Sequence, residues 1–147
     1  TFKITHNYGV PWPGPKFWCP DIEQNYDSNN YRIFRYADAI LMMAECYCNL
    51  ENAEETMRYL NMVRQRAGVD PVTNFTGFED LTLAVRCERA RELGGEFQRK
   101  FDLVRWGIAK EVLQAAGKNY QDKNALLPLP QTEIDKSNGV LVQNPDY

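Results

Sequence analysis

Apolar residues recur at intervals of three or four positions along the middle of the chain. The first such stretch contains Phe34, Ala37, Leu41, Ala44 and Cys48. Residues at these intervals share one face of an α-helix, and neither Pro nor Gly interrupts the stretch before Leu50. The pattern predicts a helix from about Tyr31 to Asn49.

A second helix is predicted directly after the first. Asn52 offers a side-chain acceptor for the first free amides, and Glu55 puts an acid in the positively polarised first turn. Gly68 supplies the left-handed residue that commonly ends a helix, so this helix should run to about Ala67. Its apolar face contains Ala53, Met57, Leu60 and Val63. The two helices should form an antiparallel hairpin similar to one tetratricopeptide unit.

A third helix is predicted from about Gly77 to Leu93, with Phe97 as its outer limit. Thr76 and Glu79 have the spacing of a capping box, in which each side chain bonds the other residue's amide. Gly94 and the glycine after it then weaken the helix. A single tetratricopeptide unit cannot bury both of its faces, so either this third helix supplies the missing layer or further repeats lie upstream.

The two ends of the chain have a different character. Residues 1–30 contain Pro, Gly and several Asn and should be an extended loop, since Pro removes amide donors and fixes φ. A short fourth helix is predicted around Ile108 to Ala116, ended by Gly117. Beyond it, Leu126–Pro130 favours extended polyproline geometry, and we expect this strip to pack across the helices. The chain is therefore predicted to be all-α, with a helical domain over residues 31–147.

Composition excludes several classes of function. The net charge of -3 and the pI near 5.2 provide no basic surface for nucleic acid. The longest apolar run, Ala39 to Ala44, is far shorter than the roughly 20 residues of a membrane-spanning helix. No export signal is visible from Thr1 onward. Neither a nucleic-acid partner nor a membrane span within this chain is therefore expected.

The cysteines do not have the spacing of a metal site. They lack a CxxC pair, and His6 is the only histidine, so we expect no metal and no Cys–His catalytic pair. Buried free thiols are the favoured interpretation, and a bridge from Cys46 or Cys48 to Cys87 stays open if the compartment is oxidising.

Three ordered blocks of sequence resemble the RagB/SusD family. The first is Arg35–Glu45, RYADAILMMAE, and the second is Glu88–Gly107, ERARELGGEFQRKFDLVRWG. The third is Leu126–Asp135, LLPLPQTEID, followed by Gln143–Tyr147, QNPDY. The blocks span residues 35–147. Two positions depart from the family's pattern: Gln98 stands where histidine is frequent, and Asp146 where glycine is common.

The resemblance implies a mostly helical, tetratricopeptide-containing lipoprotein on the outer face of the outer membrane. Such a protein sits on a SusC-like TonB-dependent transporter and delivers an oligosaccharide or another nutrient to it, without catalysis and without a cofactor. Because family members are several times longer, this chain is expected to be the C-terminal part of such a protein. The lipid-bearing cysteine and most of the repeats would then lie upstream, and Cys19 is not that anchor.

The charged residues of the second block allow two interpretations. Glu88 and Glu92 lie four residues apart on one helix face, and paired carboxylates can hydrolyse glycosides. A hydrolase, however, needs its carboxylates on opposite sides of a bound sugar, which a single helix face does not provide. We favour a structural network of salt bridges, with Trp106 packed in the core; its charged members are Glu88, Arg89, Arg91, Glu92, Glu96, Arg99, Asp102 and Arg105.

The candidate ligand-binding residues lie in the Pro-rich loop at the start of the chain. They are the large aromatic residues Tyr8, Trp12, Phe17 and Trp18. An exposed aromatic platform suits the apolar face of a pyranose, although packing against the helices or a preceding domain would also explain these residues. The alternative to glycan binding is a tetratricopeptide-type scaffold that binds a protein partner and no sugar.

Overall fold

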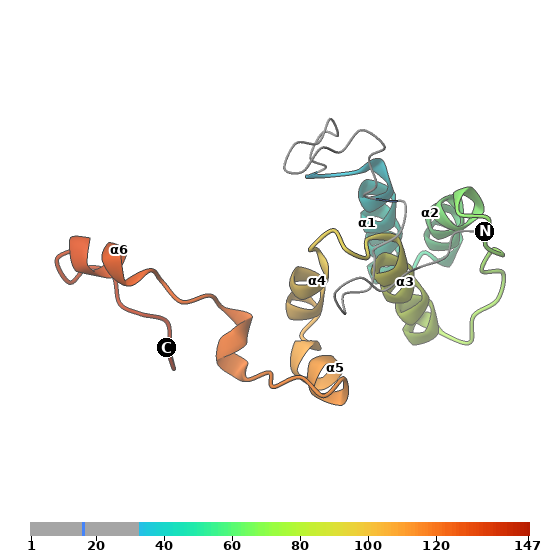
Figure 1. The fold of residues 1–147 in the computed structure, drawn as a ribbon. Coiled ribbons are helices and arrows are strands. Elements are labelled where there is room, and N and C mark those ends of the chain that lie inside the picture. Colours follow the sequence, from blue (N-terminus) through green and yellow to red (C-terminus); the bar gives the residue numbers. More distant parts are fainter. Residues whose placement is uncertain (1–15, 17–32) are drawn as a thin grey trace, which may run out of the picture. The chain divides into compact units, whose positions relative to one another are not determined.

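The computed structural model describes Lys16 and residues 33–147, and these residues form helices and no β-strand. The all-α prediction is therefore confirmed for the described part of the chain. The elements are shown in Figure 1: α1 (Tyr36–Asn49), α2 (Ala53–Arg66), α3 (Phe78–Glu92), α4 (Arg99–Arg105), α5 (Ala109–Ala115), the 3-10 turn η2 (Asp122–Ala125) and α6 (Gln131–Lys136).

The chain divides into two compact units after Gly95. The first contains α1, α2 and α3, and the second, Glu96–Tyr147, contains α4, α5, η2 and α6. The division follows Gly94 and Gly95, the pair predicted to weaken the third helix. None of the described helices is long and apolar enough to cross a membrane.

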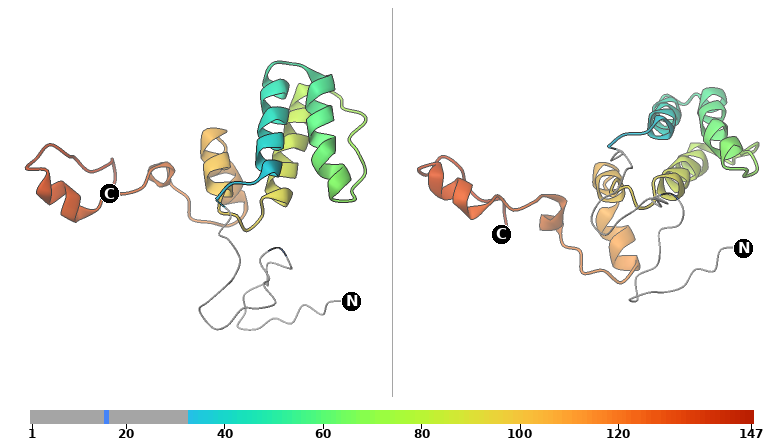
Figure 2. Two further views of the ribbon diagram at one scale, coloured as in Figure 1. Left: turned by 90° about the horizontal axis from the view of Figure 1, so that it is seen from above. Right: turned by 45° about the horizontal axis from the view of Figure 1, so that its top comes forward.

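In the first unit, α1 and α2 form the predicted hairpin and α3 packs against both (Figure 2). The core draws residues from all three helices, so α3 supplies the third layer that the hairpin lacks. Burial of each large aliphatic side chain contributes about 2 kcal/mol before conformational entropy is subtracted. The buried cluster consists of Ile40, Leu41, Ala44, Leu60, Val63 and Val85, with Tyr59, Val72 and Ala84 partly buried against it.

Helix α1 begins at Tyr36, so the predicted start at Tyr31 is wrong. Residues 33–35 are not helical, and Arg35 has extended backbone angles, φ -125° and ψ 153°. Phe34 is exposed and does not continue the buried stripe. The side chain of Arg35 is bonded to the end of α3, which holds this residue outside the helix.

The ends of α2 agree closely with the sequence. The side chain of Asn52 accepts a hydrogen bond from the amide of Glu55 at 3.1 Å, which confirms the predicted cap. The helix ends at Arg66, with Ala67 as its C-cap, and Gly68 has φ +71°. A residue with a Cβ would be strained in this left-handed conformation, so glycine suits the position.

The start of α3 corrects the predicted capping box. The amide and hydroxyl of Thr76 donate to the carboxylate of Asp80, at 3.2 and 3.4 Å, and not to Glu79. The acid one residue further along takes the role because the N-cap is Gly77, one residue beyond the predicted cap. The helix ends at Glu92, and Phe97 lies outside it with φ +63°.

The second unit contains a helix that periodicity did not reveal. We predicted no separate helix between Phe97 and Ile108, yet α4 occupies Arg99–Arg105. Gly107, with φ +71°, separates α4 from α5, and α5 is slightly shorter than predicted. The core of this unit is small and contains Leu103, Ala109 and Tyr120, with Val104, Ile108, Val112 and Leu113 partly buried around it.

The last residues of the chain are joined by side-chain hydrogen bonds to the backbone. The amide group of Gln143 pairs with both backbone groups of Leu129, at 2.8 and 2.9 Å, as a neighbouring strand would. Asn144 donates to the carbonyl of Leu127. Within this unit Leu126 and Leu127 are exposed, and the expectation that this strip packs across the helices stays a prediction. The same strip leads into α6, which was also not predicted.

The described cysteines Cys46, Cys48 and Cys87 are free thiols, so the bridge that the sequence left open does not form among them. Cys48 is buried as expected, with its sulfur 3.3 Å from the hydroxyl oxygen of Thr82. Cys46 is exposed and Cys87 is half-buried, so the expectation of buried thiols is wrong for Cys46. Cys19 lies outside the described residues.

Candidate functional site: charged side chains at the carboxyl end of α3

The second half of α3 sends charged side chains toward both helices of the hairpin. The spacing of three and four residues in the sequence ERARE places Glu88 and Glu92 on one face, with Arg89 turned to another. Each of these side chains meets an oppositely charged partner that is distant in sequence. The resulting network joins the three helices of the first unit.

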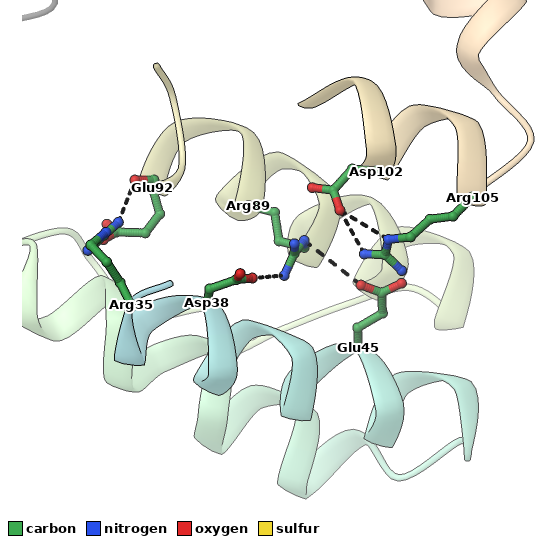
Figure 3. Close-up of polar contacts among 7 residues, drawn as sticks. All are labelled: Arg35, Asp38, Glu45, Arg89, Glu92, Asp102 and Arg105. Carbon is green, nitrogen blue, oxygen red and sulfur yellow. Dashed lines mark hydrogen bonds and ion pairs between the residues drawn. The ribbon is translucent and has the colours of Figure 1, made fainter. Parts of the chain in front are cut away.

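Arg89 forms the most deeply buried ion pair of this network. Its Nη1 atom donates to Oδ1 of Asp38 at 2.9 Å, and the two side chains are only 4% and 8% exposed (Figure 3). The Oε2 atom of Glu45 lies 4.0 Å from the Nε atom of Arg89. Both acids belong to α1, so the pair connects α3 to α1. Removing one partner of a buried pair leaves an uncompensated charge and costs about 3–5 kcal/mol.

Glu88 connects α3 to α2. Its Oε2 atom accepts a hydrogen bond of 2.7 Å from Nη1 of Arg64, and the side chain of Glu88 is 5% exposed. The Nε atom of Arg64 donates to the carbonyl oxygen of Asp70 at 2.8 Å. A single guanidinium group therefore holds α3, the end of α2 and the loop that follows α2. Arg91 is more remote, with its Nη1 atom 4.0 Å from Glu88.

Glu92 is in contact with several cationic side chains. Its carboxylate accepts a hydrogen bond of 2.9 Å from Nη2 of Arg35 and pairs with Arg66. The ammonium of Lys16 donates to the backbone carbonyls of Glu92 and Gly94, and Arg35 also donates to the carbonyl of Glu92. The last carbonyls of a helix have no intrahelical donor and carry a partial negative charge, so these cations cap α3.

The remaining residues of the predicted network lie in the second unit. Asp102 is buried and accepts hydrogen bonds of 3.1 and 2.9 Å from Nε and Nη2 of Arg105, three residues along the same helix (Figure 3). The guanidinium groups of Arg105 and Arg99 lie 4.9 and 5.8 Å from the centre of the Trp106 ring. Trp106 is half-buried beside these cations, whereas the cluster of this unit is formed by other residues. Glu96 is half-buried.

An open pocket of about 440 Å³ lies beside this network, between the ends of α2 and α3. Charged residues from both helices line it. The carboxylates of Glu88 and Glu92 accept hydrogen bonds from arginines and share one helix face, which is unlike the opposed carboxylates of a glycoside hydrolase. The lining residues are Arg64, Ala67, Val69, Glu88, Arg91 and Glu92.

The candidate ligand-binding residues lie outside the part of the chain that the structure describes. Tyr8, Trp12, Phe17 and Trp18 all belong to the residues that it does not describe. Lys16, directly before Phe17 in the sequence, is described and is bonded to the end of α3. The aromatic platform therefore remains a prediction, and Lys16 is the described residue nearest to it in the sequence.

The sequence identified the charged residues of α3 that take part in the network, but it did not identify their partners on α1 and α2. Asp38 lies three residues before the buried Leu41, so an acid on the apolar face of α1 was a signal for a buried ion pair. Arg64 and Arg66 belong to an arginine-rich helix end, where cations are common for reasons of the helix dipole alone. No local signal connects these two arginines to α3.

The chain is similar to known proteins in both sequence and structure. The sequence model described as the SusD family matches residues 20–125. The SusD-like proteins P25 and P2 of Formosa agariphila are 33% and 30% identical to the chain. These matches cover 88% and 82% of this chain, but only 27% and 26% of the two relatives.

Solved structures show the same relationship. Surface glycan-binding protein A from Bacteroides thetaiotaomicron matches with a TM-score of 0.67 and 35% identity, over 82% of this chain and 26% of that protein. A SusD-like protein from Bacteroides fragilis matches with a TM-score of 0.67 and 29% identity, over 78% of this chain and 25% of that protein. The chain thus spans about a quarter of the length of these proteins.

Proposed function

The chain belongs to the SusD family, and we propose that it is part of a protein that captures a glycan at the cell surface without chemically altering it. The observation that carries this proposal is the match to a structure named as a surface glycan-binding protein, with 35% identity and a TM-score of 0.67. Together with the resemblance of the three sequence blocks, this match supports capture of an oligosaccharide.

The further steps of the proposal concern location and transfer. The protein would be held on the outer face of the outer membrane by a lipid anchor upstream of this chain. It would pass its oligosaccharide to a SusC-like TonB-dependent transporter. Co-purification of the full-length protein with the transporter from detergent-solubilised outer membranes tests the transfer step, and protease accessibility on intact cells tests the location.

A binding role without catalysis is supported by the arrangement of the acids in α3. Glu88 and Glu92 hold arginines from α2 and from the segment before α1, which is a structural use of both carboxylates. They connect helices and would be costly to release for a reaction. We therefore place glycan contacts in the aromatic residues of the Pro-rich loop, where Trp12 and Trp18 offer the largest faces for a pyranose.

Calorimetry with a panel of oligosaccharides tests glycan capture directly. We expect saturable binding to one glycan class, with binding lost in Trp12→Ala or Trp18→Ala because the stacking face is removed. Phe101→Ala is a matched control, since it removes an aromatic side chain that is 64% exposed on α4, away from the loop in sequence. A full-length protein that folds cooperatively and binds no member of the panel contradicts the proposal.

The second candidate function is a tetratricopeptide-type scaffold for a protein partner. It is favoured by the α1–α2 hairpin and by Tyr36, Met42 and Met43, which are apolar residues of α1 exposed at the surface. This alternative predicts affinity for a helical or extended peptide and no heat of binding with any sugar. A peptide array read beside the oligosaccharide panel distinguishes the two functions.

A further inference from the structure

Helix α1 has apolar residues on two separate faces. One face contributes Ile40, Leu41 and Ala44 to the buried cluster of the first unit. The other face consists of residues spaced alternately by three and four positions, from the start of the helix to its C-cap. A helix that is apolar on more than one face is usually buried on more than one face. We call the second face the outer seam, and its residues are Tyr36, Ala39, Met43, Cys46 and Leu50.

The outer seam is exposed within the first unit. Helices α2 and α3 both pack against α1 (Figure 2), yet Tyr36 is 76% exposed, Leu50 74% and Met43 39%. Cys46 is exposed as well. Single apolar residues at a protein surface are common, but these residues form one continuous stripe along the helix. A stripe of this kind indicates a contact surface.

Charged side chains do not interrupt this face of α1. The only charged residues of the helix are Asp38 and Glu45. Both lie beside Arg89 of α3, and their side chains are 8% and 14% exposed. Helix α2 differs, because it presents charged residues such as Glu54 and Arg58 to the solvent. Since a surface helix ordinarily has a charged or polar outer face, α1 has the composition of an internal helix.

The spacing of the outer seam indicates which kind of element would cover it. Apolar residues that alternate at three and four positions are typical of the contact between two helices that cross at a shallow angle. Ala39 and Cys46 are small, and they leave room between the larger residues of the seam for side chains of a second helix. Because the seam contains no charge, the facing stripe of that helix should be apolar.

We propose that the outer seam is covered by an amphipathic helix from the part of the protein that lies outside this chain. The matches cover only 27% and 26% of the two relatives, so most of a protein of that length lies outside the chain. In stacks of helical hairpins, the terminal unit needs a polar outer face. The outer seam is apolar, so the α1–α2 hairpin is not the end of the stack on this side.

The size of the outer seam favours a helix of the same protein over a separate molecule. A standard interface between two proteins uses roughly 20–30 residues from each side. The seam, by contrast, is one side of a single helix of 14 residues and its C-cap. A covalent connection reduces the entropy cost of association, so a smaller contact is sufficient within one protein. A covered seam would also make Tyr36 and Met43 unavailable to the protein partner of the scaffold alternative.

Cys46 provides a chemical probe of the outer seam. Maleimide labelling of the 147-residue chain and of the full-length protein is followed at this residue by peptide mass spectrometry. We expect rapid labelling in the chain, where the thiol is exposed. In the full-length protein, labelling should be slower by about a hundredfold or more, because it must wait for a local opening of the contact. Cys48 is the internal control, since its buried thiol should label slowly in both proteins.

Met43→Lys in the full-length protein should increase the labelling rate of Cys46 by about tenfold or more, because an unpaired ammonium is costly to bury between two helices. In the 147-residue chain the same variant should keep its helical circular dichroism, since the position is at the surface of the first unit. Leu83→Lys is the matched control: it places the same charge on α3, at a side chain that is 59% exposed outside the seam. Labelling of Cys46 in this control should equal that of the wild type.

The proposal fails if Cys46 is labelled equally fast in the chain and in the full-length protein, because the seam is then uncovered. It also fails if Cys46 is already protected in the chain, since the covering segment would then belong to the chain itself. Protection that disappears on dilution of the full-length protein would identify a second copy as the occupant and would overturn the proposal too. Glycan capture is measured independently by calorimetry and stands or falls without these outcomes.

Discussion

The two units of this chain use the same kinds of charged residue over very different distances. In the first unit, Arg89 of α3 pairs with an acid of α1 that is 51 residues away in the sequence. In the second, Arg105 pairs with Asp102, three residues away on the same helix. Both arginines belong to one continuous block of sequence. The comparison shows that a charge pattern does not reveal whether an arginine finds an acid on its own helix or on a distant one.

The units also differ in how their elements are held. Three helices of at least 14 residues share one apolar cluster in the first unit. In the second, α4 and α5 have seven residues each, and the C-terminal residues are joined by side-chain bonds to the backbone. Helices of this length are marginal without tertiary packing. We therefore expect the second unit to open at lower free energy than the first.

The largest effect is expected for Asp38→Ala. The substitution leaves Arg89 buried without its closest acid, at a cost of about 3–5 kcal/mol in the free energy of unfolding. Urea unfolding followed by circular dichroism measures this cost. Asp38→Ala combined with Arg89→Met should recover part of it, because both charges are then absent. A loss below about 1 kcal/mol in the single variant would mean that the pair does not connect α3 to α1 in solution.

Two matched core truncations should separate the units. Leu60→Ala and Leu103→Ala each remove a fully buried leucine side chain, one from each unit, at an expected cost of about 2–5 kcal/mol. Hydrogen exchange should show Leu60→Ala exposing the amides of α1, α2 and α3. Leu103→Ala should expose those of α4 and α5 and spare the first unit. Uniform loss of protection in both variants would contradict the division into units.

A smaller effect is expected for Gln143→Ala at the C-terminal end. The variant loses the two hydrogen bonds to the backbone of Leu129, worth about 1 kcal/mol each in a typical protein and less at an exposed site. Faster exchange of the Leu129 amide should report the loss, with the amides of the first unit unchanged. Gln131→Ala is the control, since that side chain bonds only locally to Asp135 among the described residues. Unchanged exchange at Leu129 would show that these bonds do not persist.

The smallest effect concerns pH. The hydrogen bond from Arg58 lowers the pKa of Glu55 below its ordinary value, so the carboxylate stabilises the folded state above the unperturbed pKa of a glutamate. This contribution is lost as pH falls through the lowered pKa. Unfolding midpoints measured between neutral and acidic pH should fall more for the wild type than for Arg58→Gln. Parallel curves would show that the pair contributes nothing, as many exposed pairs do.

Several parts of the fold could be predicted because they depend on neighbours in the sequence. Asn52 caps α2 and Gly68 follows its end, since both roles are decided within one turn of helix. Errors arose where a distant contact intervened. Arg35 lies outside α1 because its side chain is bonded to Glu92, and helical spacing cannot show such a contact. Helices α4 and α6 have only seven and six residues. A helical repeat of apolar positions cannot be recognised over so few residues, so the sequence did not distinguish these helices from loop.

The sequence by itself determined the helical class, the hairpin, its caps and the resemblance to a family, because these depend on residue type and on spacings of a few positions. Only the tertiary structure decided which arginine meets which acid, and that the carboxylates of α3 are covered while Arg91 is exposed beside a pocket. The physical reason is that burial and ion pairing act between side chains close in space. Residues 24 to 57 positions apart in the chain are brought together only by the packing of the helices.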